Sequence, residues 1–240
     1  MRIFKSATVL IGMVAIVVSL SVYAQSATAS SPQLLFANFD ASQNTVKLNN
    51  ARLPKWQHVR DWMVDGAVAH SDPALAGWAS WAASLRGLPL PVRLDAINRR
   101  VNADFRYATD VEIWGARNYW GTPSEIVLKG ATDCKGFAIM KFWLARLAGL
   151  DDGELALLIG ILPSTHQMHA VLLVATTGTP MVLDNRHADV VDIGAFGDFR
   201  PVVAGDLQGL HLFVADPTGA GRPIEVADNH PISAGRPKDR

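Results

Sequence analysis

The sequence predicts an α+β fold in which helices come first and an antiparallel sheet follows. Apolar residues of the first half recur every three or four positions, the period of one helix face. The second half instead holds runs rich in Val, Leu and Ile, bounded by turn residues and typical of strands. With 240 residues, 49% of them hydrophobic, the chain can bury a real core, and we expect one domain over 51–216.

Two helices are predicted in the first half. Asp72 suits an N-cap, Pro73 a first helical position and Gly87 the residue after the end. A second helix is expected after Pro91. The residues that recur with helical spacing are Leu75, Trp78, Ala82 and Leu85 in the first, and Leu94, Ile97, Val101 and Phe105 in the second. We interpret both stripes as core packing.

Two further helix starts lie near the middle of the chain. Thr-Pro-Ser-Glu at 122–125 has the form of a capping box and predicts a short helix that ends near Gly130. The next helix is expected to begin at Thr132 or Asp133 and to stop at Gly149. Its apolar face holds Phe137, Met140, Leu144 and Leu147.

Cys134 falls in the first turn of that helix and is the only cysteine of the chain, so it cannot form an internal disulfide. Free N–H groups and the positive end of the helix dipole favour a thiolate there. The alternative is a small, packed residue in an ordinary helix, because buried free cysteines are common.

Strands are expected over 155–162, 168–176, 180–183 and 210–214, and the polar run 40–50 is expected to be a loop. If residues 177 and 178 form a two-residue hairpin loop, Thr176 lies opposite Thr179. His169 and Asp184 then project from the same face as diagonal neighbours within side-chain reach. A three-residue loop would change this register.

These placements give a nucleophile, a base and a group that orients the base. Cys134 would attack an amide carbonyl, His169 would take the thiol proton and later protonate the leaving amine, and Asp184 would fix the tautomer of His169. The backbone N–H of Cys134 is one candidate donor to the oxyanion, and Trp120 supplies a candidate side chain for substrate or oxyanion binding.

Other histidines offer rival interpretations. His166 is the alternative base, although it is expected in the loop before a strand. Together with His169, Asp184 and His187 it would form a ligand set of types that suit zinc, but no recognised zinc spacing is present, and we expect no metal there. We interpret His187 and His211 as ordinary surface or packing residues.

The order of four motifs resembles the bacterial transglutaminase-like cysteine proteinases, from about Trp56 to Val214. The motifs are Trp-Gly-Thr-Pro at 120–123, Asp-Cys at 133–134, His-Ala-Val at 169–171 and Leu-Asp-Asn at 183–185. The resemblance implies a papain-like or transglutaminase-like core, in which N-terminal helices and a nucleophile-bearing helix pack on an antiparallel sheet. It also implies a Cys-His-Asp triad at Cys134, His169 and Asp184.

That family includes the LapG-type periplasmic proteases, which release biofilm adhesins. The resemblance therefore implies a cysteine peptidase that cleaves a specific protein substrate, such as a surface adhesin, through a thioester acyl-enzyme, with an inner-membrane regulatory protein as partner. Three alternatives stay open: acyl transfer to an amine, a binding module without turnover, and a structural periplasmic protein with an incidental thiol.

The sequence departs from the family pattern at one position beside the cysteine. LapG-type relatives have an acidic residue on each side of the cysteine, and these acids help bind calcium. Here Asp133 is kept but the other position is Lys135, whose charge opposes a metal ion. We therefore expect no calcium dependence and no other cofactor.

The N-terminus has the layout of a secretory signal. Arg2 and Lys5 precede an apolar stretch over 7–20 and a small-residue cleavage site at Ala24. We predict a signal peptide over 1–24, a mature extension over 25–50, a flexible tail over 217–240, and a periplasmic or secreted protein; an uncleaved signal anchor is the alternative. Basic and acidic residues are equal in number, so nothing indicates nucleic acid as a partner.

Overall fold

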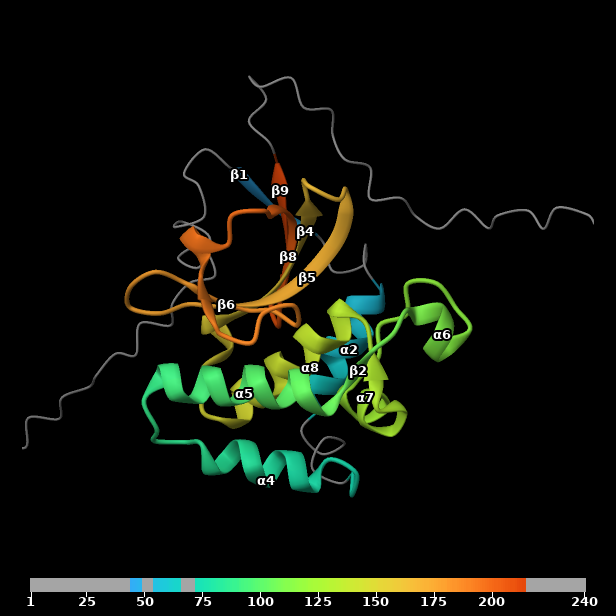
Figure 1. Ribbon diagram of the computed structural model, residues 1–240, viewed down its shortest axis with the longest axis vertical. Coiled ribbons are helices and arrows are strands. Elements are labelled where there is room, and N and C mark those ends of the chain that lie inside the picture. Colours follow the sequence, from blue (N-terminus) through green and yellow to red (C-terminus); the bar gives the residue numbers. More distant parts are fainter. Residues whose placement is uncertain (1–43, 49–53, 66–71, 215–240) are drawn as a thin grey trace, which may run out of the picture.

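The α+β prediction is confirmed by a computed structural model, which describes residues 44–48, 54–65 and 72–214. Figure 1 shows the helices gathered on one side of a twisted sheet. The predicted signal peptide, the tail and most of the extension over 25–50 lie outside the described residues. None of the described helices is long and apolar enough to cross a membrane.

Six α-helices occur in the described part of the chain: α2 (Pro54–Val64), α4 (Ala76–Ser84), α5 (Leu90–Asp104), α6 (Asp110–Trp114), α7 (Pro123–Lys129) and α8 (Cys134–Leu147). The main sheet has the order β1-β9-β8-β4-β5-β6-β7 and its neighbours are antiparallel. Its strands are β1 (Asn44–Leu48), β4 (Leu155–Leu162), β5 (Gln167–Val174), β6 (Met181–Leu183), β7 (Val191–Asp192), β8 (Arg200–Asp206) and β9 (Gly209–Val214). A small parallel pair joins β2 (Arg106–Tyr107) to β3 (Ala131–Thr132).

Helix α8 is the centre of the core and packs against β5, α5, α4 and α7. It is buried without interruption from Gly136 to Ala145, as expected for a helix enclosed on all sides. Its predicted start is confirmed: Asp133 is the N-cap, and its Oδ1 accepts hydrogen bonds from the backbone N–H of Lys135 at 3.1 Å and of Gly136 at 3.2 Å. The cap fixes where Cys134 lies relative to the sheet.

Gly136 allows the start of α8 to approach β3 closely. A Cβ at this position would lie 1.7 Å from Oγ1 of Thr132, far inside van der Waals contact. The glycine is therefore a packing requirement two residues after the cysteine, and not a helix-ending signal.

The other predicted helices agree with the structure except at one start. Thr122 and Glu125 form the predicted capping box of α7, and Gly130 follows with a φ of 59°. Both predicted apolar stripes are largely buried, with Trp78 partly exposed. However, Asp72 caps a turn instead of a helix: its Oδ1 accepts from the N–H of Ala74 at 2.9 Å, and α4 begins only at Ala76. Its short carboxylate can satisfy a turn as well as a helix end.

The hairpin register is confirmed. Leu172 pairs with Leu183 and Val174 with Met181, which is the register that places Thr176 opposite Thr179. The loop predicted over 40–50 was wrong for residues 44–48, which form β1 and pair with β9. The central strand β8 was not predicted at all.

Candidate active site

Cys134 lies in the wall of a cavity of about 480 Å³ between α8 and the sheet. His169 and Trp120 line the same cavity, so the structure brings together three of the four site residues predicted from sequence. The remainder of the lining is largely apolar, with charged residues at Lys55, Asp110, Asp133 and Lys135. Such a concave, mostly apolar site with a few convergent polar groups is typical of a substrate-binding cleft.

The sulfur of Cys134 is held against strand β5. The backbone N–H groups of Ala170 and of Lys135 are near enough to the sulfur to lower the pKa of the thiol. Because Ala170 directly follows His169 on β5, the nucleophile and the imidazole come from adjoining points of the helix and the strand.

The expected thiolate is not the resting form. Burial and the neighbouring Asp133 carboxylate raise the pKa of Cys134 to about 11, whereas Lys135 and the two backbone N–H groups lower it. The helix terminus favours the thiolate, but the loss of hydration at the buried sulfur disfavours it more strongly. The protein therefore holds a neutral thiol at neutral pH and needs a base to activate it.

His169 is well placed to be that base, because its ring is oriented by a carboxylate. Its Nε2 lies 2.7 Å from Oδ1 of Asp184, and the two side chains are 6% and 0% exposed. This leaves Nδ1 as the ring nitrogen that can act on the thiol. The diagonal contact predicted from the hairpin register is thus present.

Asp184 stays ionised although it is fully buried. Burial alone would raise its pKa, but hydrogen bonds from His169 and from the backbone and guanidinium of Arg186 lower it to about 2. Arg186 donates its backbone N–H to Oδ1 at 3.0 Å and its Nε to Oδ2 at 3.1 Å. The carboxylate therefore remains a negative charge beside the ring of His169.

The rival histidines lie elsewhere. His166 is exposed, has a φ of 57° in the turn before β5, and does not line the cavity. His187 is about half exposed, and its Nε2 is 3.7 Å from Oδ2 of Asp184. Among the described residues, no group of three or more His, Cys, Asp or Glu side chains has a geometry that could hold a metal ion.

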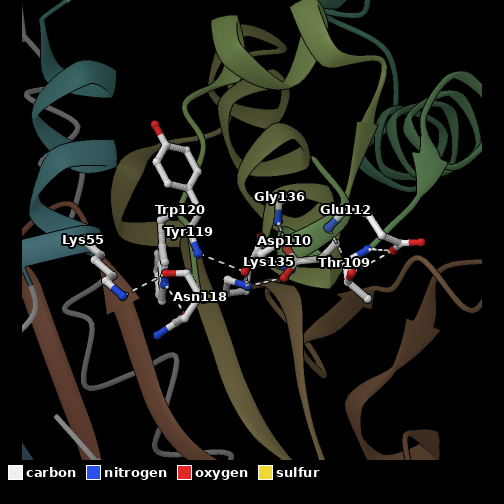
Figure 2. A network of polar contacts seen from close by, with 10 residues as sticks. Lys55, Thr109, Asp110, Glu112, Asn118, Tyr119, Trp120, Lys135 and Gly136 are labelled. Atoms are coloured by element: carbon white, nitrogen blue, oxygen red, sulfur yellow. Dashed lines mark hydrogen bonds and ion pairs between the residues drawn. The ribbon is translucent and has the colours of Figure 1, made fainter. Parts of the chain in front are cut away.

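Asn118 is a cavity residue that the sequence argument did not single out. Its φ is 53°, an uncommon left-handed conformation for a residue other than glycine. Nε1 of Trp120 donates to its Oδ1 at 3.0 Å and Nζ of Lys55 to its main-chain oxygen at 2.9 Å. Because an indole N–H can only donate, the amide atom that contacts Trp120 is the oxygen of Asn118. The amide nitrogen, Nδ2, is then available to donate to another group. Figure 2 shows this nitrogen turned away from the Trp120 ring.

Lys135 lies between two carboxylates beside the cysteine. Its Nζ contacts Oδ2 of Asp133 and is 3.0 Å from Oδ2 of Asp110 (Figure 2). All three side chains are at most 14% exposed. Asp110 also accepts the backbone N–H of Tyr119 at 2.9 Å, so the group ties the 110–119 segment to the start of α8.

The fold and the arrangement of cysteine, histidine and aspartate are those expected of a transglutaminase-like cysteine peptidase. Residues 90–195 match the family model described as bacterial transglutaminase-like cysteine proteinase, which confirms the resemblance seen in the sequence. Over these residues the chain is similar to this family, and the match supports a cysteine peptidase.

Solved structures of Legionella pneumophila LapG share the fold. The calcium-bound structure is 27% identical, with 64% of this chain and 87% of that chain covered and a TM-score of 0.52. An EGTA-treated structure is 23% identical, with 70% and 87% covered and the same TM-score, and its likeness concerns the fold alone. Comparison with curated proteins gives no match.

Proposed function

We propose that this protein is an exported cysteine peptidase that hydrolyses a specific protein substrate with Cys134, His169 and Asp184. The observation that carries the proposal is the 2.7 Å contact between His169 and Asp184, with His169 and Cys134 lining the same cavity. The cavity in front of the sulfur supplies room for a peptide segment.

The chemistry follows from a neutral thiol beside an oriented imidazole. Nδ1 of His169 accepts the thiol proton while the sulfur of Cys134 bonds to the substrate carbonyl carbon. The C–N bond then breaks, and the imidazolium returns the proton to the leaving amine. Water, deprotonated by the same imidazole, attacks the thioester; the C–S bond breaks, and the thiol is restored. Asp184 keeps Nε2 protonated throughout.

The oxyanion needs hydrogen-bond donors that are in place before reaction. The backbone N–H of Cys134 is one, because the side chain of the N-cap Asp133 accepts from the N–H groups of Lys135 and Gly136 instead. We assign the second donor to Nδ2 of Asn118. Since the indole N–H of Trp120 is bonded to Oδ1 of Asn118, Trp120 orients this amide and is not itself the donor in our proposal.

Calcium does not fit the acidic pair beside the cysteine in this chain. A relative of the same fold is described as calcium-bound, but here the ammonium of Lys135 lies between Asp110 and Asp133, where it balances their charge. A metal ion would have to displace a cation held by two carboxylates. We therefore propose a peptidase that works without calcium.

The location and the substrate are further parts of the proposal. The signal-like N-terminus supports export to the periplasm or beyond. The similarity to LapG-type proteases supports a surface adhesin as substrate and an inner-membrane regulatory protein as partner.

The proposal is tested by incubating the purified protein with the surface proteins of a strain that carries Cys134→Ala, and by mapping new chain termini by mass spectrometry. The wild type should create a defined terminus, and Cys134→Ala and His169→Ala should create none. His166→Ala is the matched control and should behave as wild type. Activity in His169→Ala with loss in His166→Ala would refute the assigned base, and products joined to an added amine would indicate acyl transfer.

A chelator provides the calcium test. Cleavage should continue in EGTA at the rate seen with added calcium. Complete loss that calcium restores would contradict the assignment of Lys135 as the resident cation.

A further inference from the structure

Lys141 is a charged residue in the interior of the otherwise apolar helix α8. It is fully buried, and its Nζ donates to Oδ1 of Asn98 on α5 at 2.7 Å. Within its own helix it faces the ring of Phe137, at 6.0 Å from the ring centroid. A lysine is almost never fully buried unless a specific interaction retains it, so the position calls for an explanation.

The partner of Lys141 reaches the segment that follows the site aspartate. Nδ2 of Asn98 donates to the main-chain oxygens of His187 at 2.9 Å and of Ala188 at 3.0 Å. One turn further along α5, Nδ2 of Asn102 donates to the main-chain oxygens of Asp184 and His187, both at 3.0 Å. The two asparagines therefore hold residues 184–188 by four hydrogen bonds.

This attachment matters because β6 is short. Its ladder with β5 ends at Leu183, so Asp184 is the first residue that the sheet no longer fixes. Asn102 holds the main chain of Asp184 instead, and Asn98, whose Oδ1 accepts from Lys141, holds the main chain three and four residues further on. Without that contact, the amide of Asn98 could rotate and exchange its oxygen and nitrogen.

The charge of Lys141 also acts on this region. Desolvation lowers the pKa of Lys141 to about 7, and Asp184 opposes that shift. The polar groups in contact with the carboxylate are Arg186 and His187 from the following loop and His169 from β5. Lys141 is therefore only partly protonated at neutral pH, and its protonated form is favoured by the Asp184 carboxylate.

We infer that Lys141, Asn98 and Asn102 form a buried brace that fixes the main chain of Asp184 and so directs its carboxylate onto Nε2 of His169. Lys141 is then a positioning residue of the triad, reaching it from the far side of the core. The inference rests on the proposed peptidase function for its kinetic consequence only; the geometric consequence stands without it.

Lys141→Met tests the brace because methionine fills similar space without a donor or a charge. The change removes a desolvated amine but leaves Oδ1 of Asn98 without its donor, so we expect only a small change in thermal stability. We expect kcat to fall, by up to about 10²-fold, with KM little changed, because misplacement of a catalytic group mainly affects the chemical step. Lys141→Gln, which keeps an N–H donor, should recover part of the rate.

Leu144→Ala is the matched control. Leu144 is fully buried on the same helix, one turn beyond Lys141, and its truncation should clearly lower the thermal midpoint because it leaves a cavity. It should leave the kcat of the folded protein near wild type. If Leu144→Ala lowers kcat as strongly as Lys141→Met, or if Lys141→Met keeps full kcat, the brace has no positioning role.

A spectroscopic measurement separates this inference from the proposed function. The proton on Nε2 of His169 in its bond to Asp184 should give a downfield ¹H NMR resonance, identified by its loss in His169→Ala. In Lys141→Met it should move or broaden, and in Leu144→Ala it should stay. An unchanged resonance in Lys141→Met overturns the brace even if the protein proves not to be a peptidase. Failure of the wild type to cleave protein, with the resonance shifted, overturns the function alone.

Discussion

The ammonium of Lys135 lies 3.0 Å from Oδ2 of Asp110 and also contacts Asp133, so the chain itself supplies a cation beside its nucleophile. The carboxylates are hardly exposed, and without a cation their repulsion would be poorly screened. Lys135 also opposes the effect of Asp133 on the pKa of Cys134. Lys135 therefore joins Asp110 to the start of α8 and also lowers the pKa of the thiol.

Lys135→Glu should make hydrolysis depend on calcium. The change removes the ammonium and puts a third carboxylate beside Asp110 and Asp133, and clustered carboxylates are what calcium binds. The variant should be inactive in EGTA and recover with calcium, measured as the rate of substrate cleavage. Lys135→Met removes the charge without adding a ligand and should respond less; equal recovery of both variants would show that the third carboxylate is not a ligand.

Removing the charge of Asp133 and removing the charge of Lys135 should shift the pKa of Cys134 in opposite directions. Asp133 raises the pKa of the thiol and Lys135 lowers it. Asp133→Asn should therefore lower the midpoint of iodoacetamide alkylation below the wild-type value near 11, while asparagine still caps the helix. Lys135→Met should raise it. Equal midpoints in all three proteins would mean that burial alone sets the pKa.

Two variants of Asn118 should distinguish the role of its side-chain donor from the effect of its left-handed backbone conformation. Asn118→Gly relieves the left-handed φ but removes Nδ2, and Asn118→Ala removes Nδ2 without that relief. If Nδ2 stabilises the oxyanion, both should lower kcat by about 10²–10³-fold with little change in KM. Their alkylation rates should match wild type, because alkylation forms no oxyanion. Full activity in Asn118→Gly would exclude the donor role.

Lys141 should give the stability of the fold a pH dependence. Its pKa is about 7 in the folded protein and 10.5 ordinarily, so between these values the unfolded chain binds a proton that the folded one lacks. The free energy of unfolding should therefore rise with pH, by at most about 1.4 kcal/mol per pH unit. Lys141→Met should lose this slope in denaturant titrations from about pH 7.5 to 9, below the range where Cys134 titrates. Equal slopes would show that Lys141 is not desolvated.

Local patterns were sufficient to predict much of the site. Thr122 and Asp133 each cap a helix through contacts within three residues, and such contacts leave a readable spacing. The hairpin likewise follows from a turn between apolar runs, and it placed Asp184 near His169. These predictions depended on neighbours along the chain, which a sequence displays directly.

The features that were missed depend on distant parts of the chain. β8 has Pro201 near its start and Gly205 near its end, both unfavourable in strands, and it is recognisable only between β4 and β9. The register shifts at Gly160, where a Cβ would lie 2.4 Å from the main-chain oxygen of Arg200. The thiol pKa needed the burial of the sulfur, which the helix position does not reveal. The position of Lys141 inside an otherwise apolar helix is a visible signal of a special role. Its partner Asn98, however, is 43 residues away along the chain and cannot be recognised from the sequence.

Asn44 and Val214, the first and last residues that the structure describes, are paired neighbours on β1 and β9. The turn at 177–179 is exposed and separates His169 from Asp184 along the chain. A circular permutant joined between Asn44 and Val214 and opened at this turn would carry the imidazole and the carboxylate near opposite ends of one polypeptide. Cut into two chains there, the protein would become a split enzyme whose activity reports the reunion of its halves.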